Sequence, residues 1–221
     1  MSSLKELSQK YGDDVDKDNL KGGGRLNKHP QGRWILEKLP IITQDIGNDS
    51  INEKLISIIK TTIAEQKTEK GVPKPVTNWF MHLFSSEFGW VSDQAIKIAK
   101  ENAPAPVQLE TFDCWGARFG KDGYSFIKVH NHWPAAWSWV YYPKACDDCV
   151  PLVFDDCPLY DPWSAPLTSE PWQVASKTNR IVVFPGWVRH SVPKHTCDHD
   201  RVVVAGNIHV KYRPTPELNM I

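Results

Sequence analysis

The second half of the chain alternates short apolar, β-branched segments with turns rich in glycine and proline. Segments of this kind, four to eleven residues long, are typical of strands in an antiparallel sheet. We expect strands at 107–114, 115–119, 124–130, 136–142, 150–155, 171–174, 179–184 and 200–210, with a hairpin turn at Gly120–Gly123. Many short strands with such turns predict a mainly β sandwich or double-sheet jelly roll.

The first half has a different, helical pattern. Leu55, Ile56, Ile59 and Ile63 recur at helical spacing after a Ser-x-x-Glu capping box that begins at Ser50, which predicts a helix over 51–66. A second helix is expected over 92–102. Both helices are expected to cover the sheet. The result is an α+β chain in which the β layers dominate.

The N-terminal residues do not show either pattern. Residues 1–33 are charged and carry the run Gly22–Gly24, so we expect a mobile N-terminal arm there. The apolar stretch 34–42 is expected to open the sheet, and 34–221 is expected to form a single domain. The sequence contains no internal repeat.

Composition narrows the class of partner. Lysine plus arginine and aspartate plus glutamate number 26 each, and this zero net charge argues against nucleic acid as a partner. No apolar run is long enough to cross a membrane, and the N-terminus lacks the apolar core of a secretory signal. We therefore expect a cytoplasmic protein that acts on a small molecule or a peptide. A homodimer stays open, since no sequence element specifies one.

Three histidines and one arginine carry the candidate chemistry. His130 and His132 would project from the same face of an extended strand, and His190 begins a later extended stretch. Neutral imidazoles suit iron, copper, nickel and zinc. Arg201 opens an apolar strand, where a buried charge needs a partner, and a ligand carboxylate is the partner we expect. The alternatives are a polar pair of histidines and a structural ion pair of the arginine.

These residues, in this order, resemble the signature of the Fe(II)- and 2-oxoglutarate-dependent dioxygenases, and most closely a branch of oxygenases from bacteria and phages. The resemblance covers about residues 107–210. The residues that carry it are Trp115, Gly123, His130, Asn131, His132, Ser138, Tyr141, Tyr142, Phe184, Pro185, His190, Val192, Pro193, Arg201 and Asn207.

The resemblance implies a double-stranded β-helix, a jelly roll of cupin-like architecture. It implies that His130, His132 and His190 bind Fe(II) and that Arg201 binds a carboxylate of 2-oxoglutarate. Tyr142, Tyr141 and Asn207 are further candidates for binding this cosubstrate. The activity implied is an oxygenase, most simply a hydroxylase, that couples decarboxylation of 2-oxoglutarate to succinate with substrate oxidation.

The sequence departs from the wider superfamily at one ligand, because His132 stands where a carboxylate is usual. A three-histidine site also fits a cupin-like metalloenzyme that does not use 2-oxoglutarate. The ten tryptophans leave a third reading, a non-catalytic jelly-roll binding module. As walls of a substrate pocket we single out Trp133, Trp137, Trp139 and Trp187, which flank the histidines and would otherwise be core residues.

The five cysteines allow two interpretations, a structural zinc site and reduced free thiols. Cys146 and Cys149 form a C-x2-C pair, and Cys197 and His199 follow later, a spacing found in structural zinc sites. There is no second C-x2-C pair, so reduced free thiols are the alternative. A disulfide is disfavoured in the reducing compartment that we expect.

Overall fold

The computed structural model describes residues 40–66, 75–103, 106–120, 126–154 and 172–211. The chain divides into the units Met1–Leu39 and Pro40–Ile221, and all described residues belong to the second unit. The arm predicted over 1–33 therefore lies outside the described residues, as does most of the turn predicted at Gly120–Gly123. No helix among the described residues is long and apolar enough to span a membrane.

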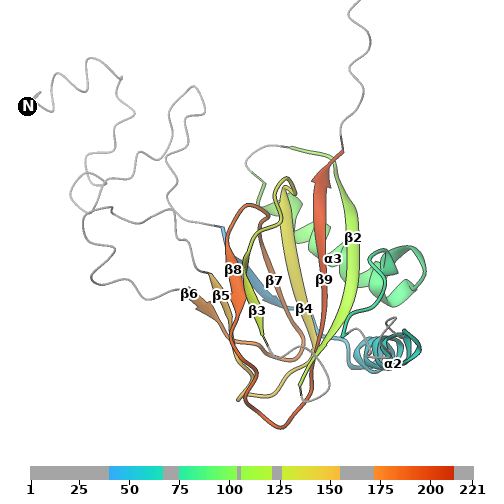
Figure 1. Ribbon diagram of the computed structural model, residues 1–221. Coiled ribbons are helices and arrows are strands. Elements are labelled where there is room, and N and C mark those ends of the chain that lie inside the picture. The colour runs from blue at the N-terminus through green and yellow to red at the C-terminus, as the bar shows by residue number, and fades with distance from the viewer. Residues whose placement is uncertain (1–39, 67–74, 104–105, 121–125, 155–171, 212–221) are drawn as a thin grey trace, which may run out of the picture. The chain divides into compact units, whose positions relative to one another are not determined.

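Two antiparallel sheets make up the β layers (Figure 1). The larger sheet has the strand order β1-β7-β4-β9-β2, and the smaller has β3-β8-β5-β6. The strands of the larger sheet are β1 (Ile42–Asp45), β2 (Leu109–Phe119), β4 (Trp137–Lys144), β7 (Arg180–Pro185) and β9 (Arg201–Val210). Those of the smaller sheet are β3 (Ile127–His130), β5 (Leu152–Phe154), β6 (Trp172–Val174) and β8 (His190–Val192). The predicted jelly roll is confirmed.

The strand predictions agree with these bounds except at three places. Strand β1 begins only at Ile42, the last residue of the stretch 34–42 that was expected to open the sheet, and residues 34–39 lie outside the described residues. Residues 109–119 form one continuous strand, with a register irregularity between Thr111 and Asp113, where two strands were predicted. Strand β3 ends at His130, so the expectation that His130 and His132 share one extended strand is wrong. His132 instead begins a turn, in which its N–H donates to the Gly186 carbonyl at 2.7 Å and its carbonyl accepts from the Ala135 N–H at 2.8 Å.

Both predicted helices are present, with earlier starts. Helix α2 spans Asp49–Glu65, and its cap is Asn48, which accepts from the Ile51 N–H; the prediction that Ser50 caps it is wrong. Helix α3 spans Ser86–Glu101, six residues longer at its start than predicted, with Ser85 as cap. A short 3-10 helix, η2, spans Met81–Leu83.

The two α-helices cover one face of the larger sheet. Leu55, Ile59, Phe88 and Val91 are fully buried there. Gly116 on β2 makes this close approach possible, because a Cβ atom at this residue would lie 2.4 Å from Cγ1 of Ile59. The opposite face of the larger sheet, which the helices do not cover, forms the inside of the jelly roll.

The Gly116→Ala variant is expected to lose about 1–3 kcal/mol of unfolding free energy, because its methyl group overpacks a helix–sheet contact. Gly89→Ala in α3 is the matched control. A Cβ there meets nothing closer than the His82 carbonyl oxygen at 3.7 Å, so the higher helix propensity of alanine should stabilise the protein by about 1 kcal/mol. Urea unfolding measures both, and equal midpoints for the two variants would contradict the packing argument.

Candidate metal centre

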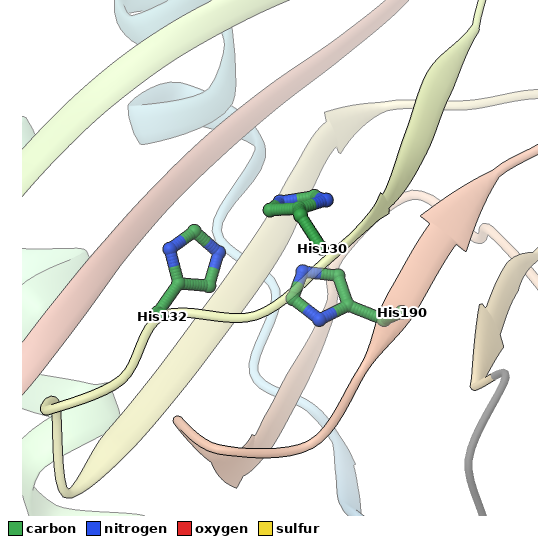
Figure 2. A group of neighbouring side chains, drawn as sticks. All are labelled: His130, His132 and His190. Atoms are coloured by element: carbon green, nitrogen blue, oxygen red, sulfur yellow. The ribbon is translucent and has the colours of Figure 1, made fainter.

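Three imidazole rings converge between the end of β3 and the start of β8 (Figure 2). The ring centroids of His130 and His190 are 4.4 Å apart, those of His130 and His132 are 5.0 Å apart, and those of His132 and His190 are 5.1 Å apart. One ring nitrogen from each residue lies within 4.8 Å of the others. This arrangement places three nitrogen donors around one point, where they could hold a metal ion.

Backbone carbonyls fix the orientation of two of these rings. Nδ1 of His130 lies 2.8 Å from the Lys128 carbonyl oxygen, and Nδ1 of His190 lies 3.0 Å from that of Val188. Because a carbonyl only accepts, each Nδ1 donates a proton and each Nε2 keeps a lone pair. Metal-binding histidines in proteins are held in the same way. The residues therefore fit a divalent metal bound through Nε2.

Burial keeps two of the rings neutral. It lowers the pKa of His190 to about 3 and that of His132 to about 4, and the neighbouring His130 acts in the same direction. A neutral imidazole is the form that binds a metal, so at neutral pH these two ligands need not lose a proton first.

The histidines open into a cavity of about 440 Å³ between the two sheets. The same cavity reaches Arg201 and Tyr142. Aromatic side chains form much of its wall, namely Trp79, Trp115, Phe119, Phe126, Trp139 and Phe184. The rings of Trp79 and Trp115 lie 4.6 Å apart, and Trp115 lies 6.2 Å from the His132 ring. The three histidines and the buried Arg201 cation thus share one aromatic-lined space.

Arg201 is 1% exposed and has no ion pair with a carboxylate in the described part of the chain. Its Nη1 donates to the Val150 carbonyl at 2.7 Å and to Oγ of Ser176 at 3.1 Å, and its guanidinium lies 4.1 Å from the centroid of the Phe119 ring. Its Nε is buried and has no hydrogen-bond partner among these residues. Burial lowers its pKa from the usual 12.5. A buried guanidinium that lacks a carboxylate partner and has an unpaired N–H donor can bind the carboxylate of a ligand.

The two neighbouring tyrosines lie on opposite faces of β4. Tyr142 lines the cavity, while the Tyr141 hydroxyl donates to Oδ1 of Asn52 at 2.6 Å on the helix-covered side. Asn207 does not line the cavity either. Its amide donates to Asp113 Oδ1 at 2.8 Å and accepts from the Ser138 hydroxyl at 2.7 Å. Of these three candidates, the structure brings only Tyr142 to the histidines and Arg201.

The four predicted pocket tryptophans also separate. Trp137 and Trp139 both pack in the core under the helices, and Trp139 also borders the cavity. Trp133 and Trp187 are 73% and 37% exposed. Sequence reasoning missed Trp79, since the residues before α3 show no periodicity. It also missed Val150, because the bond to Arg201 uses the Val150 backbone carbonyl, which no side-chain pattern reveals.

The cysteines form a second cluster in the loops between β4 and β5 and between β8 and β9. The Sγ atoms of Cys146, Cys149 and Cys197 lie 3.3, 3.6 and 3.8 Å apart, and Nε2 of His195 lies 3.3 Å from Cys197. The four described cysteines, which include Cys114, are free thiols.

Comparison with known families gives one match. The model of a family described as "Putative 2OG-Fe(II) oxygenase" matches residues 113–207, which include the three histidines and Arg201. No curated protein matches the chain by sequence.

Solved structures share the fold at low sequence identity. HygX from Streptomyces hygroscopicus, solved with nickel, 2-oxoglutarate and hygromycin B, is 11% identical, with a TM-score of 0.57 over 88% of this chain and 87% of its own. A prolyl-4-hydroxylase from Pseudomonas putida is 16% identical, with a TM-score of 0.58 over 80% and 96%. The viral collagen prolyl hydroxylase of Paramecium Bursaria Chlorella virus-1, in complex with 2-oxoglutarate, is 12% identical, with a TM-score of 0.55 over 80% and 100%.

Proposed function

We propose that the protein is an Fe(II)/2-oxoglutarate-dependent oxygenase that hydroxylates a small molecule or a peptide, because residues 113–207 match the model of a family described as "Putative 2OG-Fe(II) oxygenase". The observation that carries the proposal is the single cavity that joins His130, His132 and His190 to the buried Arg201. The compartment we propose is the cytoplasm, which the free thiols of the described cysteines support.

Each residue has a role in this proposal. The three histidines would hold Fe(II), with His130 and His190 binding through their Nε2 atoms. When bound, Fe(II) with 2-oxoglutarate activates oxygen and couples release of carbon dioxide and succinate to substrate oxidation. Arg201 binds the carboxylate of 2-oxoglutarate that is remote from the metal, and Tyr142 stands beside it. The aromatic wall excludes water and favours a substrate with a flat or apolar group.

The direct test is the binding of 2-oxoglutarate to anaerobic, Fe(II)-loaded protein. We expect stoichiometric binding, measured by titration calorimetry, and a visible charge-transfer band that appears only when both metal and 2-oxoglutarate are present. Succinate, which lacks the 2-oxo group, is the control and should give no such band. Iron binding without 2-oxoglutarate binding would contradict the proposal and favour a three-histidine metalloenzyme of another kind.

Tyr141 and Tyr142 form a matched pair for a second test. Tyr141→Phe is expected to lower the unfolding free energy by about 1 kcal/mol, since the Asn52 amide loses a buried partner, and to leave 2-oxoglutarate affinity unchanged. Tyr142→Phe should weaken that affinity roughly tenfold, the value of one hydrogen bond to a charged group. Urea unfolding and calorimetry measure the two effects. Weaker 2-oxoglutarate binding in Tyr141→Phe would contradict the assignment of the two faces.

A further inference from the structure

We propose that Cys146, Cys149 and Cys197, with an imidazole that we assign to His195, form a structural zinc site separate from the histidine centre. The three sulfur atoms come from two loops, and Cys197 is 48 residues beyond Cys149 in the chain. Three thiols at mutual distances of 3.3, 3.6 and 3.8 Å form a triangle, whereas a disulfide would join only two of them. The fold thus gathers three soft ligands at one point.

The dimensions of this triangle fit zinc. In a tetrahedral site with Zn–S bonds of about 2.3 Å, neighbouring sulfurs are about 3.8 Å apart. A Cys3His ligand set is among the common structural zinc sites. An additional contact supports thiolate ligands, because the Cys146 N–H points to Sγ of Cys149 at 3.3 Å, and a donor directed at sulfur stabilises its negative charge.

Two histidines stand beside the sulfur triangle, each within 4.8 Å of two of its three sulfurs. A nitrogen of His195 lies within 4.8 Å of the sulfurs of Cys149 and Cys197, and a nitrogen of His199 lies within 4.8 Å of those of Cys146 and Cys197. His195 is the better candidate because it is half-buried, whereas His199 is exposed. The Nε2 atom of His195 lies 2.7 Å from the His199 carbonyl oxygen, which only accepts, so this nitrogen carries the proton and Nδ1 keeps the lone pair. That Nδ1 atom is buried and has no hydrogen-bond partner in the described ranges, so it is the nitrogen that we assign as the ligand.

The position of the cluster indicates what the zinc does. Cys149 directly precedes Val150, whose carbonyl accepts from Nη1 of Arg201 at 2.7 Å. Cys197 lies four residues before Arg201 itself, in the loop that leads into β9. A zinc ion that joins these loops would fix both ends of this hydrogen bond. Resting on the proposed function, this makes the zinc site a support for the arginine that binds 2-oxoglutarate.

The first experiment is metal analysis of the purified full-length protein, followed by cobalt substitution. We expect one zinc per chain in addition to any metal at the histidine centre. Co(II)-loaded protein should show an intense near-ultraviolet thiolate-to-cobalt band, which three imidazoles cannot produce. The His190→Ala background should retain this band. A wild-type protein whose cobalt form lacks the band would overturn the proposal, whatever the behaviour of the variants.

Substitutions then assign the ligands. Cys197→Ser and Cys149→Ser should each lose the zinc and the cobalt band, and Cys114→Ala, at a buried thiol outside the cluster, should lose neither. His195→Ala should weaken zinc binding at least tenfold more than His199→Ala, and the reverse order would overturn the assignment of the fourth ligand. Zinc content that is unchanged in both cysteine variants would overturn the site itself.

The supporting role is tested separately. Cys197→Ser should retain Fe(II) binding but bind 2-oxoglutarate several-fold more weakly, and it should melt at a lower temperature than Cys114→Ala. Unchanged affinity would overturn the link to Arg201 while the zinc site stands. If the wild-type protein binds no 2-oxoglutarate, the proposed function fails, yet zinc content and the cobalt band still decide this inference.

Discussion

The His190→Ala variant is expected to bind Fe(II) at least roughly 100-fold more weakly than the wild type, because even residues behind the direct ligands contribute 10- to 100-fold to metal affinity. Oxidation of substrate should fall below detection. His190 is 5% exposed, and its ring lies 4.4 Å from that of His130 and 5.1 Å from that of His132. Among the described residues, only these three could hold a metal at this point, so none can take the place of His190. Anaerobic titration with Fe(II) and quantification of succinate measure the two effects.

His209→Ala is the control for this prediction. The His209 ring stacks on Phe112 with centroids 4.2 Å apart and does not line the cavity, so its loss should leave iron affinity unchanged. Circular dichroism checks that both variants fold. Equal Fe(II) affinity in His190→Ala and the wild type would show that the three histidines are not the iron site, even if the fold is that of an oxygenase.

The sequence predicted the elements of this fold well because its strands are short and separated by strong turn residues. It was less accurate where the local signal was weak. Helix α3 begins at Ser86, but Gly89 and Trp90 in its first turns obscure the helical pattern. The capping box at Ser50 competed with Asn48, and the structure uses the asparagine, whose side chain accepts from Ile51.

The candidate site followed from the sequence only in part. Strand β8 begins at His190 as expected, but His132 reaches the centre through a turn held by Gly186, a contact between distant backbone atoms. Alternation along β4 implies that only one of Tyr141 and Tyr142 faces the cavity. Which one does so depends on the side that the helices cover, and this is tertiary information. The sequence could not decide between a zinc site and separate thiols for the same reason. The spacing of the cysteines along the chain does not reveal whether their two loops meet.

The Arg201→Met variant is expected to bind 2-oxoglutarate roughly 100-fold more weakly, since the loss of one partner of a buried charge pair costs several kcal/mol. Methionine keeps much of the packing against Phe119 but removes the charge. Fe(II) affinity should stay unchanged, because Arg201 is not among the residues that could hold the metal. Arg201→Lys keeps the charge without the planar fork and should lie between the wild type and Arg201→Met. Calorimetry with Fe(II)-loaded protein under anaerobic conditions gives both affinities.

Arg180→Met is the matched control, because Arg180 pairs with Asp45 at 3.1 Å on the protein surface, where such a pair contributes little. It should bind 2-oxoglutarate like the wild type. If Arg201→Met also binds like the wild type, the arginine is a structural residue held by Val150 and Ser176. The cupin-like reading, a three-histidine metalloenzyme that does not use 2-oxoglutarate, would then account better for the site. A selective loss in Arg201→Met would instead tie the carboxylate of 2-oxoglutarate to this end of the cavity, and the search for substrate would move to the aromatic wall around the histidines.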